Sequence, residues 1–92
     1  MRIIEDYGNL ENDLLSIESA KYIGDFAIRI SFNDGFSRLV DFKLFLKNSL
    51  HPSIRRYLKE GKFKKFELVD GNLNWNDYDL IFPLEDLYEG KL

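Results

Sequence analysis

Cationic side chains are concentrated near the middle of this 92-residue chain. Residues 43–65 contain eight lysines and arginines against Glu60 alone, whereas the whole chain has a formal net charge of −3. Such a stretch can bind an anionic partner, or acidic segments on either side of it can neutralise it. The candidate partner- or anion-binding face consists of Arg55, Arg56, Lys59, Lys62, Lys64 and Lys65.

The net negative charge favours a protein over a nucleic acid as the partner of this face, because nucleic-acid modules usually carry net positive charge. Tyr57, Phe63 and Phe66 are interleaved with the cations and could stack on bases, but their spacing is that of core residues. Nucleic-acid binding through residues 55–65 is the alternative, and it predicts an affinity that falls steeply with salt.

Carboxylates at Asp77 and Asp79 would share one face of a strand, as a general acid/base pair or a cation site requires. The competing interpretation is that Asn76-Asp77 forms a turn and that Asp79 is solvated. Calcium usually takes about six or more oxygen ligands, and the chain has no calcium-loop pattern. We therefore predict no metal site, although these two residues and Asp41 are the carboxylates that an enzyme would use.

His51 is the one histidine, and the chain has no cysteine. With Ser49 or Ser53 it could be imagined in a catalytic triad, but neighbours in sequence do not have triad geometry, and no nucleophile elbow is present. We expect His51 to lie in a turn between helices. The glycines are separated turn residues rather than a phosphate-binding loop, so we expect neither a cofactor nor enzymatic activity.

Trp75 and the Tyr78–Phe82 stripe could line a ligand pocket. The predicted pairing of Trp75 with Phe66 across a hairpin already accounts for its large apolar side chain, so we expect Trp75 in the core.

The composition, with 45% hydrophobic and 15% aromatic residues, is that of one small globular domain. We assign residues 14–92 to a single compact domain and residues 1–13 to an acidic N-terminal extension. No apolar run approaches the roughly 20 residues of a membrane span. The first residues turn acidic where a signal peptide is apolar, so we expect a cytoplasmic protein.

Two hairpins are predicted from turn residues and alternating hydrophobicity. Strand-like composition over residues 14–23, with a break in the alternation that suggests a bulge, precedes a strand over residues 26–32. A three-residue loop, Asn33-Asp34-Gly35, pairs Ile28 with Val40 and places the apolar side chains on one face. In the second hairpin, Asp70-Gly71 forms a two-residue turn that places Leu68 opposite Leu73.

Short helices are predicted between and after the hairpins. Asp41 can cap a helix that ends near Asn48, and Pro52 can begin a second helix that Gly61 terminates. A last strand is expected over residues 78–82, followed by a helical turn that Gly90 closes. The fold class is α+β: an antiparallel meander of about five or six strands, with two or three short helices packed on one face.

Several of these stretches resemble the small bacterial domain-of-unknown-function family 2442. The turn segment Phe32-Asn33-Asp34-Gly35 is similar to a motif of that family, and the C-terminal half follows one of its variants more closely. The matching stretches, within residues 14–89, are Val40-Asp41-Phe42, residues 52–57, Phe63-Lys64-Lys65-Phe66, Asp70-Gly71, Leu73-Asn74-Trp75, residues 77–80 and residues 82–88.

The resemblance implies a compact α+β domain and no established reaction or cofactor. Members are often encoded beside another small protein, which implies a two-component pair of the toxin–antitoxin kind. We therefore expect a non-enzymatic module that binds a small protein partner and is the accessory or antitoxin-like member of such a pair. A homodimer is a further possibility, and no membrane association is expected.

Overall fold

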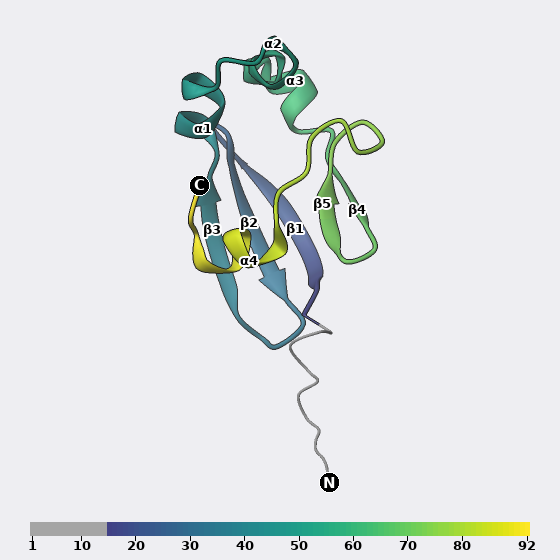
Figure 1. The fold of residues 1–92 in the computed structure, drawn as a ribbon. Helices are drawn as coiled ribbons and strands as arrows, with labels where there is room; N and C mark the ends of the chain where they lie inside the picture. The colour runs from purple at the N-terminus through teal and green to yellow at the C-terminus, as the bar shows by residue number, and fades with distance from the viewer. Residues whose placement is uncertain (1–14) are drawn as a thin grey trace, which may run out of the picture.

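The computed structural model describes residues 15–92, and the predicted extension at residues 1–13 lies outside that range. The fold is α+β, as the sequence predicts (Figure 1). Its strands are β1 (Ile17–Gly24), β2 (Ala27–Phe32), β3 (Ser37–Asp41), β4 (Glu67–Val69) and β5 (Asn72–Asn74). Its helices are α1 (Lys43–Asn48), α2 (Pro52–Arg55), the 3-10 turn η2 (Arg56–Leu58), α3 (Glu60–Phe63) and α4 (Leu84–Glu89).

The five strands form two antiparallel sheets rather than the single meander that was expected. One sheet has the order β1-β2-β3, and β4 pairs with β5 in a separate hairpin. The two are joined where the Ile17 amide donates a hydrogen bond to the Gly71 carbonyl at 2.8 Å. In Figure 1 the segment from α1 to α3 lies at one end of the larger sheet, while α4 lies across a face of it.

The β2–β3 hairpin has the predicted register. Ile28 pairs with Val40, and the Phe32 amide donates to the Phe36 carbonyl at 2.8 Å, which closes the three-residue loop. Gly35 has a φ of +91°, a conformation that glycine adopts without the steric cost of a side chain.

The break in alternation in β1 is a bulge. Ile17 pairs with Phe32 and Ser19 with Ser31, so Glu18 is the extra residue. Because the bulge shifts the alternation by one residue, Ile17 is buried on the same face as the partly buried Ala20.

Asp41 supplies the acceptor predicted at the start of α1, since its Oδ1 accepts the Lys43 amide at 2.9 Å, although Phe42 occupies the N-cap position. Pro52 begins α2 as expected. The prediction for Gly61 is wrong, because Gly61 lies inside α3 rather than ending a helix in the left-handed conformation. The chain instead breaks at Lys59, whose extended backbone separates η2 from α3.

The β4–β5 hairpin also has the predicted register, with Leu68 opposite Leu73. Asp70 and Gly71 have φ values of +52° and +79°, as a two-residue turn of this kind requires. Leu73 is buried, but its partner Leu68 is exposed.

The predicted last strand is wrong apart from one bridge between Trp75 and Leu80. Asn76, Asp77 and Tyr78 instead have φ values of +51°, +55° and +71°, and they form a left-handed turn. The side chain of buried Asn74 stabilises this turn by accepting the Tyr78 amide at 2.7 Å. Three left-handed residues other than glycine are unfavourable locally, so contacts elsewhere must hold them.

Gly90 ends α4 in the left-handed conformation, as predicted. The helix is attached to the β2–β3 hairpin by two long-range hydrogen bonds. The Tyr88 hydroxyl donates to Asp34 Oδ2 at 2.5 Å, and Arg38 Nε donates to the Tyr88 carbonyl at 2.9 Å.

The core lies between the larger sheet and the segments that follow it. It is rich in aromatic rings, and Phe42 alone contacts Phe63, Trp75 and Phe82 with ring centroids 5.2–5.9 Å apart. The other fully buried large side chains are Ile28, Ile30, Phe32, Leu46, Leu73 and Leu87. Within residues 15–92 there is no helix of the length and apolarity that a membrane crossing demands.

Candidate functional site

The candidate basic segment folds as three short consecutive turns, α2, η2 and α3, and its cations have different surroundings. Arg55 contacts backbone at the end of α1: its Nη1 donates to the Lys47 carbonyl at 2.5 Å and to the Ser49 carbonyl at 3.4 Å. Carbonyls at a helix C-terminus lack partners within the helix, so a cation there is stabilising. Arg55 therefore holds α1 against α2.

Arg56 forms an ion pair with Asp79, which directly follows the three left-handed residues of the turn. The same carboxylate oxygen accepts the Tyr57 hydroxyl at 2.7 Å. The hydrogen bonds from Tyr57 and Arg56 hold the pKa of the Asp79 carboxyl below its ordinary value. Burial, and then the hydrogen bond to Asp79, raises the pKa of the Tyr57 hydroxyl. These contacts attach the turn to η2.

The four lysines of the segment differ from its two arginines. We call them the lysine surface: Lys59, Lys62, Lys64 and Lys65. All four are exposed, and none forms an ion pair with an acidic residue within residues 15–92. No acidic side chain within residues 15–92 therefore neutralises these four charges, and a partner can bind them.

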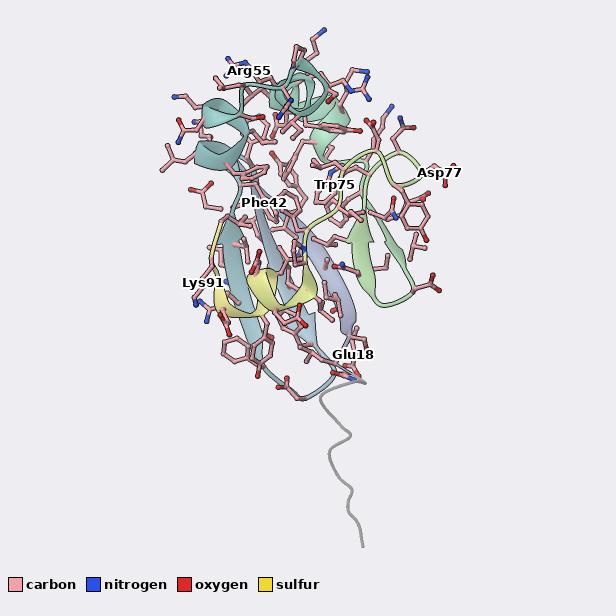
Figure 2. The ribbon with its side chains drawn as sticks, in the orientation of Figure 1. Glu18, Phe42, Arg55, Trp75, Asp77 and Lys91 are labelled. Atoms are coloured by element: carbon pink, nitrogen blue, oxygen red, sulfur yellow. The ribbon has the colours of Figure 1, made fainter. Side chains whose placement is uncertain are left out.

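A groove of about 660 Å³ lies beside the lysine surface. Lys62 and Lys65 line it together with Glu67 and Asp77, so the groove carries charges of both signs. In Figure 2, Asp77 lies at the outer end of the left-handed turn, whereas Trp75 lies in the interior of the molecule. A groove with mixed charges suits the varied side chains of a protein better than a uniform row of phosphates.

Trp75 belongs to the core, as the sequence predicts, and only its edge reaches the groove. The side chain is 1% exposed, and its ring lies 5.9 Å from that of Phe66 between centroids. Tyr57 and Phe63 are buried as well, so these rings cannot stack on bases without unfolding. In the Tyr78–Phe82 stripe, Tyr78 is exposed and Phe82 is buried, so the two do not line a common pocket.

The carboxylates considered for catalysis are not brought together. Asp77 and Asp79 belong to a turn rather than a strand, and Asp79 is engaged by Arg56 and Tyr57. Asp41 accepts the Lys43 amide at the start of α1. Among the residues from 15 onward, no three His, Cys, Asp or Glu side chains are grouped so that they could hold a metal ion.

His51 lies between α1 and α2, as expected, with its backbone at the N-cap of α2. The Ser49 hydroxyl oxygen accepts its backbone amide at 3.2 Å, and its carbonyl accepts the amides of Ile54 and Arg55 at 2.9 Å. These are backbone contacts of a turn, which is the structural role expected from the sequence.

Sequence reasoning missed the tyrosine contacts that hold the basic segment in place. Besides the Tyr57–Asp79 bond, the Tyr22 hydroxyl donates to Glu60 Oε2 at 2.5 Å and connects β1 to α3. Burial raises the pKa of the Tyr22 hydroxyl, and the bond to Glu60 raises it further. Glu60 is therefore engaged with Tyr22 rather than with a lysine. The partners are 38 and 22 residues apart, so no local pattern could have indicated them.

A sequence model of one protein family, described as "Protein of unknown function (DUF2442)", matches residues 17–92. The matched range includes every helix and strand described above. Searches of curated proteins and of solved structures gave no significant match.

Proposed function

We propose that this chain, which belongs to the DUF2442 family of proteins of unknown function, is a cytoplasmic, non-enzymatic protein–protein interaction module. Its lysine surface and the adjoining groove bind a small protein with a complementary acidic surface. The chain is the accessory or antitoxin-like member of a two-component pair.

One observation carries the proposal: four exposed lysines are concentrated between the end of η2 and the residues that directly follow α3, without acidic partners within residues 15–92. Like charges held close together repel one another, and an acidic partner relieves that repulsion and is steered toward the surface. The arginines of the segment do not share this role, since Arg55 and Arg56 are engaged in contacts within the fold.

Lys62 and Lys65 are therefore the residues to change, because substitutions of Arg55 or Arg56 would also remove contacts within the fold. The test variant is Lys62→Glu with Lys65→Glu. Its matched control is Lys21→Glu with Arg29→Glu, which changes the charge equally at exposed residues opposite each other on β1 and β2.

The tagged chain and both variants are used to capture proteins from the host in the presence of nuclease, and the captured proteins are quantified by mass spectrometry. We expect one small acidic protein to be retained by the unmodified chain and the control. Its affinity for the Lys62/Lys65 variant, measured with purified protein, should fall about tenfold or more, because two favourable charge contacts become repulsive. Equal affinity for both variants would contradict the role of the lysine surface.

Nucleic-acid binding through residues 55–65 is the competing outcome of the same experiment. It predicts that capture is lost on nuclease treatment and that the purified chain binds mixed DNA and RNA with a strong salt dependence. The acidic Glu67 and Asp77 beside the lysines, the buried aromatic rings and the net charge of −3 favour the protein partner.

A further inference from the structure

The groove beside the lysine surface has carboxylates as well as cations in its lining. The charged side chains of the lining that make no contact elsewhere in the fold are Lys62, Lys65, Glu67 and Asp77. All four are exposed, and within residues 15–92 none of them forms an ion pair or a side-chain hydrogen bond. Two positive and two negative charges therefore line one groove without neutralising one another by direct contact.

The turn that carries Asp77 is held to the rest of the fold on both sides of that residue. The Asn74 side chain accepts the Tyr78 amide at 2.7 Å, and the Asp79 carboxylate accepts the Tyr57 hydroxyl at 2.7 Å. Asp77 itself has a φ of +55°, a left-handed conformation that aspartate tolerates better than most residues. These contacts keep Asp77 at the outer end of the turn (Figure 2), where it forms no ion pair with a lysine of the described chain.

Charges of both signs make the groove selective. A nucleic acid presents phosphates at regular intervals, so the lysines would attract it while the Glu67 and Asp77 carboxylates would repel it. A protein segment differs, because it can place a carboxylate against the lysines and a lysine or arginine against the two acidic residues. Repulsion of the wrong partner is one of the two ways in which an interface becomes specific. The groove is therefore complementary to a segment that carries both charges.

We infer that Glu67 and Asp77 determine which partner the groove accepts: they bind a cationic side chain of a protein partner and exclude nucleic acids from the lysine surface. The segment of the partner that enters the groove therefore carries a lysine or an arginine beside its acidic residues. This inference rests on the proposed function, since it concerns the partner of the same surface.

The test removes the two carboxylates from the groove and leaves its lysines in place. The test variant combines Glu67→Lys with Asp77→Asn, because asparagine also tolerates the left-handed conformation. Its matched control combines Glu18→Lys with Asp70→Asn. Glu18 and Asp70 are exposed, Asp70 is left-handed with a φ of +52°, and neither residue lines the groove. The two variants thus change the net charge equally, and circular dichroism verifies that both are folded.

Nucleic-acid binding is measured first, with a fluorescently labelled, mixed-sequence single-stranded DNA of about 20 nucleotides at low salt. We expect the Glu67/Asp77 variant to bind this DNA about tenfold or more tightly than the wild-type chain and the control do, because the repulsive carboxylates are gone. The gained affinity should fall steeply with added salt. Glu67→Lys alone, which leaves the turn unchanged, should give part of the gain. Fluorescence anisotropy of the labelled DNA measures all four proteins.

Recognition of a cation is measured with two synthetic peptides of equal length. One peptide consists of glutamates only, and in the other the second half is lysine. We expect the ratio of their affinities to shift about tenfold toward the all-glutamate peptide in the Glu67/Asp77 variant, because that variant repels the lysines which the wild-type groove attracts. The control should keep the wild-type ratio. Shifts of the amide signals of Lys62 and Lys65 in NMR spectra give both affinities and show that the peptides bind at the groove.

The inference would be overturned if the Glu67/Asp77 variant bound the DNA no more tightly than the control, or if its peptide ratio were that of the wild-type chain. Either result would leave the proposed function standing, because the lysines could still bind a protein. The proposed function fails on a different measurement, namely an equal affinity of the captured protein for the Lys62/Lys65 variant and for its own control.

Discussion

Trp75 contacts Phe63 in two ways: its indole N–H donates to the Phe63 carbonyl at 2.6 Å, and the two rings stack with centroids 5.5 Å apart. Phe63 is the last residue of α3, and Trp75 directly follows β5. The pair therefore connects the segment that carries the lysine surface to the small hairpin, and it satisfies a carbonyl at a helix end.

Two substitutions of Trp75 distinguish the contribution of its hydrogen bond to stability from the contribution of its packing. Trp75→Phe keeps an aromatic ring but leaves the Phe63 carbonyl without its donor, and it should reduce the free energy of unfolding by about 1–3 kcal/mol. Trp75→Ala also leaves a cavity and should cost about 3–5 kcal/mol. Urea denaturation followed by circular dichroism measures both. Equal costs for the two variants would show that the ring contacts contribute little.

The two glycines at 71 and 61 should respond oppositely to alanine. Gly71 has a φ of +79°, and a Cβ there would lie 2.6 Å from Ser16 Cβ, so Gly71→Ala should destabilise the chain by about 2 kcal/mol or more. Gly61 lies in α3 with open space around it, so Gly61→Ala should stabilise by about 0.5–1 kcal/mol. Thermal unfolding of the two variants measures both changes: the melting temperature should fall for Gly71→Ala and rise for Gly61→Ala. Destabilisation by Gly61→Ala would contradict the helical conformation at that residue.

Acid should weaken the fold in part through Asp79. Its pKa is lowered in the folded chain by the bonds from Tyr57 and Arg56, so its contribution is present above the unfolded pKa of about 3.9 and is lost as the pH falls through the folded pKa. Asp34 follows the same rule, because the Tyr88 hydroxyl lowers its pKa.

The urea midpoint of the wild-type chain should therefore decline as the pH falls below about 4. Asp79→Asn cannot titrate and should decline less over the same range, while starting from a lower midpoint at neutral pH. Identical pH profiles for the two proteins would remove Asp79 from the explanation.

Arg55 and Lys59 offer a comparison within the basic segment. Arg55→Ala removes the donor to the Lys47 and Ser49 carbonyls and should cost about 0.5–1.5 kcal/mol of stability. Lys59→Ala removes an exposed side chain without a partner within residues 15–92, and it should change stability by less than about 0.5 kcal/mol. Chemical denaturation of the pair shows whether the two cations differ as the structure indicates.

The parts of the fold that could be predicted from the sequence are those whose conformation is determined by residues adjacent in the chain. Asn33-Asp34-Gly35 and Asp70-Gly71 determine their turns locally, and a change of register would move apolar side chains to the wrong face. Both registers were therefore predicted correctly, and the position of Trp75 followed from the second one.

The error at residues 76–82 arises where side-chain contacts, one local and two between distant residues, override the local strand preference. Asn76, Asp77 and Tyr78 adopt left-handed backbone because Asn74 accepts the Tyr78 amide and Asp79 is held by Tyr57 and Arg56. The alternation at residues 78–82 gave no sign of those bonds.

In the candidate site, the composition identified six cations as a group. The division between two engaged arginines and four lysines without an acidic partner among residues 15–92 depends on partners brought near by tertiary folding. The acceptors of Arg55 and Arg56 are backbone carbonyls and a carboxylate whose positions the basic segment does not itself encode.

The attachment of α4 to the β2–β3 hairpin has a consequence for the order in which the chain folds. The hairpin contacts join residues close in sequence, whereas the bonds from Tyr88 to Asp34 and from Arg38 to Tyr88 close loops of 54 and 50 residues. Longer loops cost more entropy to close, so the larger sheet should form first and α4 should dock late. Amide hydrogens of α4 should then exchange with solvent through a local opening, well before those of β2.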